Sequence, residues 1–176
     1  MSSKPSPDYL AGYDPALVHQ VQQLIAENRL AEALLRKYPR AHEIRTDKAL
    51  YDYVNEIKDS HLGKTGPLSR VAFDSTMQIL RQTLGTHMRL SRVQGNRLKS
   101  KREIHVAALF KSVPPEFLRM IVVHELAHLK EADHGKAFYQ LCRHMEPDYH
   151  QLEFDLRVYL TYLDATGAPL WSATAP

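Results

Sequence analysis

The chain from 124 to 134 reads His124-Glu125-Leu126-Ala127-His128-Leu129-Lys130-Glu131-Ala132-Asp133-His134. Side chains four residues apart lie on one face of an α-helix, so His124 and His128 can approach a single metal ion. Glu125 is turned away from that pair, yet it can reach a water molecule on the metal, which is the position of a general base. His134 follows six residues later and is a candidate third ligand. Three neutral imidazoles leave a fourth coordination position for water, as in a catalytic zinc site.

The residues before this motif predict a buried helix. From Pro115 to Val123 the chain is mostly apolar, with Pro115 suited to a first helical position and Glu116 suited to the positive end of the helix dipole. Gly135 is expected to end this helix and turn the chain back. Two histidines and a glutamate are costly to bury in an apolar helix unless they have partners. The context therefore favours a hydrolytic metal site over histidines satisfied by ordinary hydrogen bonds.

The bulk composition is that of a globular protein. A chain of 176 residues fits one domain spanning 1–176, with an irregular lead-in at 1–14 and a frayed tail at 168–176. Apolar residues make up 44% and charged residues 24%, and the formal net charge of +3 is too small to indicate nucleic acid by itself. The one cysteine, Cys142, excludes an internal disulfide framework and fits a reducing compartment.

The N-terminus has no apolar run typical of a signal peptide, and we find no stretch near the ~20 apolar residues of a membrane helix. We therefore expect a soluble, cytoplasmic protein without a membrane partner.

The spacing of apolar residues, together with capping, glycine and proline residues, predicts the remaining helices and strands. We expect a helix from Pro15 to Tyr38, a helix capped by Thr46 and ending before Gly63, a short strand at 71–73, a short helix from Ser75 to Gly85, a β-hairpin with strands near 88–93 and 102–110, a helix from 137 to 145, and a last helix from Tyr149 to Gly167. The hairpin leads into the motif helix. A strand beside an active cleft can pair with an extended peptide through main-chain hydrogen bonds.

A hairpin, a His-Glu-x-x-His helix and a turn that carries a third histidine resemble the zincin superfamily. The chain is most similar to the YgjP-like metal-dependent hydrolases, which are grouped with WLM and SprT-like peptidases, and the segments that carry the resemblance are 91–99, 117–138 and 145–155. The resemblance implies a zincin-like α+β fold: a small antiparallel sheet or hairpin packed on the active-site helix, with flanking helices. It also implies Zn²⁺ bound by His124, His128 and His134, with Glu125 as the base. Glu131 stands where the metzincins have glycine, so the chain departs from that clan.

The resemblance leaves the substrate open. Wider relatives cleave peptide bonds, some of them in proteins crosslinked to DNA, whereas YgjP-like proteins have been described as nucleoside triphosphate pyrophosphatases, notably for UTP. By chemistry alone, one zinc on three imidazoles with a glutamate base suits attack on a carbonyl, because phosphoanhydride cleavage commonly uses Mg²⁺ or two metals. Hydrolysis of a peptide-like bond is therefore the favoured function, with UTP pyrophosphatase and a non-catalytic zinc-binding module as alternatives.

A run of basic residues supports the nucleotide alternative. The hairpin carries Arg89, Arg92, Arg97 and Lys99 with no acidic residue among them. They can form a solvated strand face, a clamp for phosphates, or a patch for a nucleic-acid backbone. The hairpin has no aromatic residue for base stacking, which favours a small phosphate ligand over single-stranded nucleic acid.

Further polar residues are candidates for supporting roles. Glu131, Asp133 and Glu153 can orient the ligand imidazoles, and Tyr139, Tyr149 and His150 can donate hydrogen bonds to a transition state. For each of these six, a solvated or packing role is the alternative.

Overall fold

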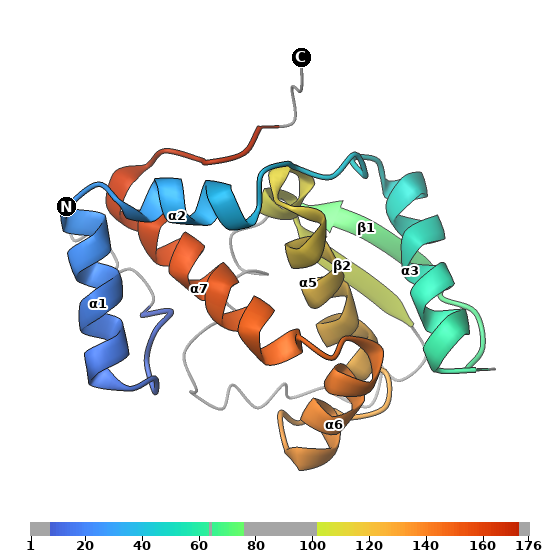
Figure 1. The fold of residues 1–176 in the computed structure, drawn as a ribbon. Coiled ribbons are helices and arrows are strands. Elements are labelled where there is room, and N and C mark those ends of the chain that lie inside the picture. Colours follow the sequence, from blue (N-terminus) through green and yellow to red (C-terminus); the bar gives the residue numbers. More distant parts are fainter. Residues whose placement is uncertain (1–7, 64, 76–101, 173–176) are drawn as a thin grey trace, which may run out of the picture.

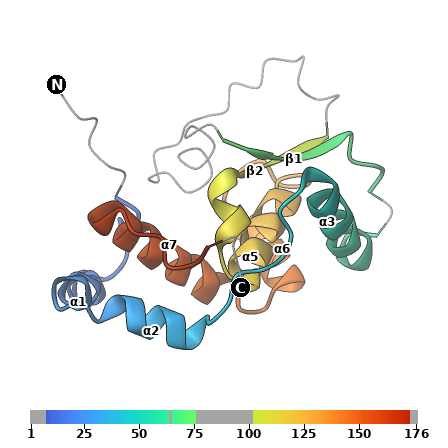
Figure 2. The same cartoon turned by 90° about the horizontal axis from the view of Figure 1, so that it is seen from above.

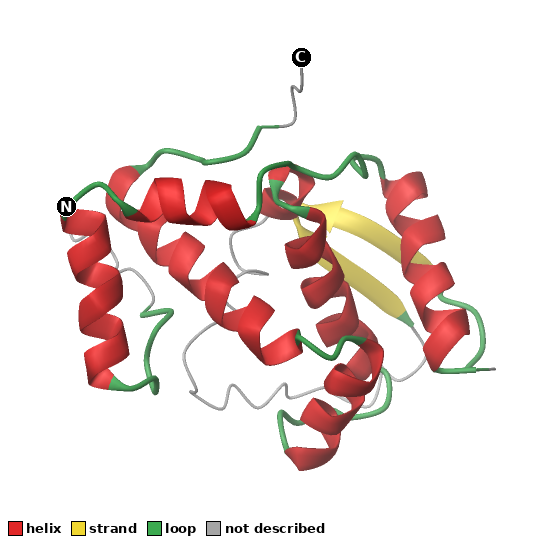
Figure 3. Cartoon of the chain, in the orientation of Figure 1, coloured by secondary structure: helices red, strands yellow, loops and turns green. Residues whose placement is uncertain are grey.

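The computed structural model describes residues 8–63, 65–75 and 102–172. Its elements are, in chain order, α1 (Pro15–Ala26), α2 (Leu30–Lys37), α3 (Asp47–His61), β1 (Arg70–Asp74), β2 (Glu103–Ala107), the 3-10 helix η1 (Ala108–Ser112), α5 (Pro115–Ala127), α6 (Lys136–Met145) and α7 (Tyr149–Thr166). Helices form most of the described chain, and the two strands lie together at one side (Figures 1 and 3). This is an α+β arrangement.

The two described strands pair in parallel, with Val71 opposite Ile104 and Phe73 opposite Val106. The sequence predicted a small antiparallel sheet instead, so the pairing of the described strands differs from that expectation. A parallel pair needs a crossover of a dozen or more residues, and the chain between Asp74 and Glu103 is long enough to provide it. The expected strand at 88–93 and the expected helix at 75–85 lie largely outside the described residues.

Both strands match predicted segments and bury one face. Ile104 and Val106 are at most 1% exposed, and Val71 is buried beside them. The helix α3 packs against β1 while α5 packs against β2, so both helices cover the same side of the sheet (Figure 2). This packing gives the motif helix a fixed position beneath β2.

The helix α5 occupies the centre of the protein, in contact with β2, α3, α6 and α7. It begins at Pro115 as predicted, and nine of its residues are buried, including Phe117, Met120 and Leu126. It ends at Ala127 rather than near Gly135. At about 1.5 Å per residue, a continuous helix would carry His134 about 9 Å beyond His128, too far to share one ion.

The predicted helix from 15 to 38 is divided into α1 and α2. The break lies at Asn28, which has a φ of 55°, a left-handed conformation that asparagine tolerates better than most residues. The following amide, from Arg29, donates back to the Leu24 carbonyl and closes the end of α1. The next helix follows its prediction, because the Thr46 side chain accepts from the Ala49 amide and caps α3.

Both chain ends have residues that pack into the core in their described parts. In the lead-in, Tyr9 and Leu10 are buried, and in the tail Trp171 is only 5% exposed. The Trp171 indole N–H donates to the Tyr38 carbonyl at 2.7 Å, and its ring packs on Phe117 and Tyr159. Within the tail, Trp171 is therefore a packing residue.

None of the helices in the described ranges is both long enough and apolar enough to cross a membrane.

Candidate metal centre

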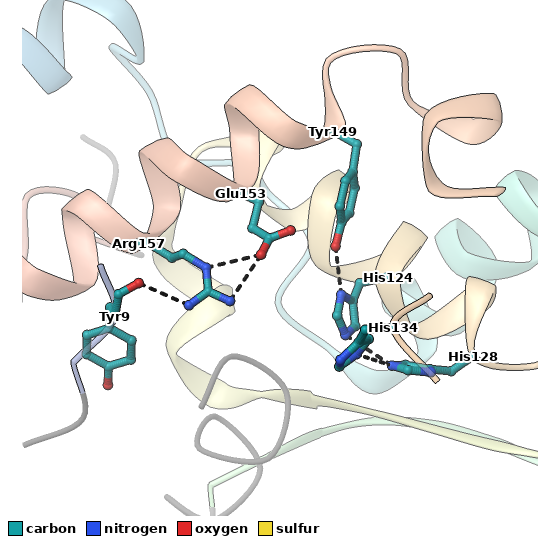
Figure 4. A network of polar contacts seen from close by, with 7 residues as sticks. All are labelled: Tyr9, His124, His128, His134, Tyr149, Glu153 and Arg157. Carbon is teal, nitrogen blue, oxygen red and sulfur yellow. Dashed lines mark hydrogen bonds and ion pairs between the residues drawn. The ribbon is translucent and has the colours of Figure 1, made fainter. Parts of the chain in front are cut away.

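Three histidine side chains meet at the C-terminal end of α5. The Nε2 atom of His128 lies 3.2 Å from Nε2 of His124 and 2.9 Å from Nε2 of His134. Figure 4 shows the three rings turned toward one another, two from the end of α5 and one from the turn that follows it. The ring nitrogens that could serve as ligands all lie within 4.8 Å of one another. The fold therefore brings together the three histidines that the sequence predicted as ligands.

The spacing of these nitrogens suits a tetrahedral metal ion. Two imidazole nitrogens, each about 2.0–2.1 Å from a tetrahedral zinc, are separated by about 3.3 Å. The observed distances of 3.2 and 2.9 Å are close to this value. A set made only of imidazole nitrogens suits zinc and other transition metals, whereas Mg²⁺ prefers oxygen ligands. The donor set fits a zinc-like ion.

The His124 and His128 rings are each oriented by a hydrogen bond at Nδ1, the nitrogen that faces away from the centre. Nδ1 of His128 lies 3.0 Å from the main-chain carbonyl oxygen of Glu131, and Nδ1 of His124 lies 2.7 Å from the Tyr149 hydroxyl. A carbonyl can only accept, so Nδ1 of His128 carries the proton and Nε2 presents its lone pair to the centre. Such hydrogen bonds fix the tautomer and the ring direction of a metal-binding histidine.

The three imidazoles also share an apolar support. The Phe138 ring, fully buried on α6, lies with its centroid 5.0, 4.6 and 4.8 Å from those of His124, His128 and His134. The negative end of the α5 dipole is at the same place and favours a bound cation. Phe138 restricts movement of the rings on one side, and the C-terminal end of α5 provides a partial negative charge that favours a cation.

Exposure rises across the centre. His124 is buried, His128 is half-buried and His134 is exposed, so the metal position is accessible from the His134 side. Glu125, next to the buried ligand in the chain, is half-buried. A catalytic ion needs this arrangement, because protein groups must hold the ion while water and substrate reach it.

A buried ion pair lies one helical turn along α7 from Tyr149, the residue that contacts His124. On α7, the Arg157 guanidinium contacts Glu153 Oε1 through Nε at 3.1 Å and Nη2 at 3.0 Å. Burial raises the pKa of the Tyr149 hydroxyl well above its usual range, and the negative charge and hydrogen bonding of Glu153 raise it further. The hydroxyl is therefore neutral at ordinary pH.

The supporting residues predicted from sequence have different positions. Of the three acids, Glu131 orients His128 through its backbone rather than its carboxylate, Asp133 is exposed, and Glu153 lies beyond Tyr149. The Tyr139 ring centroid is 6.5 Å from that of His134, and the His150 ring lies tilted beside Tyr139, with centroids 5.3 Å apart. Whether these two donate to a transition state stays a prediction.

The predicted phosphate-binding residues Arg89, Arg92, Arg97 and Lys99 lie outside the described residues. Sequence reasoning identified Phe138 only as a core position and missed its contact with the histidines. Helical spacing gave no signal for this contact, because His134 lies in the turn between α5 and α6 rather than in a helix with Phe138.

Comparisons with known proteins show which family this chain belongs to. The family model of the YgjP-like metallopeptidase domain matches residues 73–159, from the end of β1 into α7. A relative from Escherichia coli (strain K12), described as a UTP pyrophosphatase, is 54% identical over 155 residues, which cover 88% of this chain and 93% of the relative. No solved structure gave a significant match. With a family model over the candidate centre and a close relative over nearly its whole length, this chain belongs to the YgjP-like family of metallopeptidase-type hydrolases.

Proposed function

We propose that the protein is a zinc-dependent hydrolase that cleaves nucleoside triphosphates and releases pyrophosphate. The observation that carries the proposal is the convergence of the His124, His128 and His134 Nε2 atoms at distances of 2.9 and 3.2 Å beside the base candidate Glu125. In this proposal the three imidazoles hold the ion and Glu125 accepts a proton from the attacking water.

The bound zinc would supply Lewis acidity, lowering the pKa of a coordinated water toward ~7. The protein residues hold the ion and transfer the proton. His124 and His128 are fixed by Tyr149 and by the Glu131 carbonyl, so their nitrogens do not need to reorient when the ion binds. Glu125 takes the proton from water and can pass it to the leaving group. The exposed side of the centre, at His134, leaves room for a charged substrate.

The relative supports the choice of substrate. At 54% identity over 93% of its length, the protein described as a UTP pyrophosphatase is similar to this chain well beyond the motif. The chemistry of the motif alone favoured a peptide-like bond as the substrate. The similarity to this relative now favours a nucleotide instead. We therefore infer a nucleoside triphosphate whose α–β phosphoanhydride bond is broken by water, and we assign its phosphate contacts to Arg89, Arg92, Arg97 and Lys99.

Hydrolysis of a peptide-like bond is the second candidate. The family model is that of a metallopeptidase domain, and a single ion on three imidazoles with a glutamate base suits attack on a carbonyl. A reducing, cytoplasmic setting, consistent with the single cysteine, fits both candidates.

The test measures pyrophosphate release from a panel of nucleoside triphosphates by the zinc-loaded protein. We expect release with UTP, and a loss of about 10²–10⁴-fold in kcat for Glu125→Gln with zinc still bound. Glu116→Gln is the matched control, because it removes the same charge from an exposed site at the opposite end of α5. Full activity in Glu125→Gln would overturn the role of this residue.

A peptide library in the same assay separates the two candidates. Peptide cleavage that depends on Glu125, without pyrophosphate release from any nucleotide, would replace the proposed function with the second candidate.

A further inference from the structure

Three polar residues of α7 form a buried row that leads to His124. Tyr149, Glu153 and Arg157 follow one another at intervals of four and so lie on one face of the helix. Their exposed fractions are 0%, 8% and 9%. At the near end the Tyr149 hydroxyl is 2.7 Å from His124 Nδ1, and at the far end Arg157 Nη1 donates to the Tyr9 carbonyl at 3.0 Å (Figure 4).

The direction of the Tyr149 hydrogen bond determines whether His124 can bind a metal through Nε2. If the hydroxyl accepts from Nδ1–H, then Nε2 keeps its lone pair and can coordinate. If the hydroxyl donates to Nδ1 instead, the neutral ring carries its proton on Nε2 and cannot coordinate there. A hydroxyl that accepts from His124 still has its own proton to donate, so it needs an acceptor on another side.

Glu153 is placed to be that acceptor. Both contacts from Arg157 go to its Oε1 atom, and Figure 4 shows the other carboxylate oxygen on the side that faces Tyr149. An ionised carboxylate accepts hydrogen bonds and cannot donate, so it draws the hydroxyl proton toward itself. The oxygen of Tyr149 is then left to accept from His124. Arg157 neutralises the charge that this arrangement buries.

The stability of the ion pair alone does not explain its position. Replacing a buried ion pair by packed apolar side chains is often neutral or stabilising, so a buried pair is weak support for a purely structural role. Its place one helical turn from the tyrosine that contacts His124 suggests a role at the metal centre.

We propose that Glu153, held by Arg157 and acting through the Tyr149 hydroxyl, sets the tautomer of His124 before the metal arrives. The three are positioning residues, since each acts on its neighbour and so on the His124 ring. The inference rests on the proposed function in one respect, namely that His124 binds metal through Nε2.

The first experiment reads the tautomer in the metal-free protein. We would label histidine with ¹⁵N and record the ring nitrogens by NMR at a pH well above about 6.5, the usual pKa of histidine. We expect His124 to carry its proton on Nδ1 in the wild type and to shift toward the Nε2–H form in Tyr149→Phe. Tyr159→Phe is the matched control: it removes a buried hydroxyl from the same helix, at a ring that packs on Phe117 and Trp171. An Nε2–H form of His124 in the wild type would overturn the proposal.

The second experiment measures zinc affinity by competition with a chelator. Tyr149→Phe should weaken binding about 10–100-fold, the usual loss when a partner of a metal-binding histidine is removed. Glu153→Gln should weaken binding in the wild-type background but have little further effect in Tyr149→Phe, because it acts through the hydroxyl. Equal effects of Glu153→Gln in both backgrounds would mean that Glu153 acts independently of Tyr149, and the proposal would be wrong.

Glu153→Gln leaves Arg157 buried without its charge partner and can impair folding. The double variant Glu153→Met/Arg157→Leu avoids this problem by replacing both members of the pair. We expect it to fold, with a Tm lowered only by loss of the Arg157 donor to the Tyr9 carbonyl, and to lose zinc affinity as Tyr149→Phe does. Wild-type affinity in this variant would show that the pair is only structural.

The zinc-binding results distinguish failure of the proposed function from failure of the present inference. If wild type binds no zinc, or if His128→Ala leaves zinc affinity unchanged, the metal centre itself has been misassigned. If zinc binding depends on His128 but Tyr149→Phe changes neither the affinity nor the His124 tautomer, only the present inference fails.

Discussion

His128 Nδ1 lies 3.0 Å from the main-chain carbonyl oxygen of Glu131, in the turn that follows α5. The same turn is closed by the Glu131 amide, which donates to the Ala127 carbonyl at 2.9 Å. The backbone of residue 131 thus orients a candidate metal ligand, and it does so with an atom that every residue type has. The Glu131 side chain is not required for this contact.

Glu131→Ala should therefore leave zinc affinity within a few-fold of wild type, since the carbonyl that holds His128 remains. Glu131→Pro should weaken it strongly, because proline removes the amide that closes the turn. Chelator competition on both variants checks this prediction. A large loss of affinity in Glu131→Ala would assign an orienting role to the carboxylate.

His134→Ala should weaken zinc binding by more than the roughly 100-fold that loss of an orienting partner costs, because it removes a ligand itself. Its side chain is exposed, so the Tm of the metal-free protein should change little. His144→Ala, at an exposed histidine on α6, is the control and should retain full affinity. Unchanged zinc content in His134→Ala would mean that another group completes the site.

Phe138→Leu should reduce both stability and zinc affinity, since Phe138 packs beneath all three imidazoles. We expect a loss of about 0.5–3 kcal/mol in unfolding free energy, typical of a substitution in a core. Phe110→Leu is the matched control, because Phe110 is also buried, at 1% exposed, and lies on η1 rather than on α6. It should lose similar stability and keep its zinc affinity, and an equal loss of affinity in both variants would show a general effect of core loosening.

Zinc should raise the Tm of the wild type. A ligand that binds only the folded state stabilises it by about 2.7 kcal/mol at a concentration 100 times Kd. Thermal unfolding with added zinc, and again after a chelator, measures this effect. His128→Ala should show no such shift, and a shift that persists in it would place the stabilising ion elsewhere.

His42 should make folding sensitive to acid. Its Nε2 lies 2.6 Å from the Phe110 carbonyl while its Nδ1 accepts from the Ile44 amide at 2.9 Å, so the ring is neutral in the fold. Burial lowers the pKa of His42 below its usual value near 6.5, and the hydrogen bond to the Phe110 carbonyl opposes this only in part. The unfolded chain therefore binds the proton more readily, and the stability from this residue is complete above about pH 6.5 and is lost as the pH falls toward the lowered pKa.

The measurement is the unfolding free energy between pH 7.5 and 5 for wild type and His42→Gln. The variant should show a shallower decline, because glutamine has no proton to gain in this range. His19→Gln, at an exposed position on α1, should decline as the wild type does. Identical slopes in wild type and His42→Gln would contradict the prediction.

Local features of the fold could be predicted from neighbouring residues. Thr46 caps α3, Pro115 opens α5 and Gly167 closes α7 at a φ of 67°, each as the sequence indicated. These signals act within about one helical turn, through a side-chain oxygen, a fixed φ or a missing Cβ. The division of the first predicted helix at Asn28 was missed, because asparagine only tolerates a left-handed conformation and does not require it.

The pairing of His124 with His128 could be predicted from their spacing, because helical geometry places residues four apart on one face wherever the helix lies. The sequence also identified the family, which the comparisons confirmed. Three relationships emerged only from the fold: α5 ends at Ala127 so that His134 can return, β1 and β2 run in parallel, and Tyr149 contacts His124, which lies 25 residues away in the chain. These relationships depend on the packing of α5 against α6, α7 and β2, and packing between segments distant in the chain has no periodic signal in the sequence.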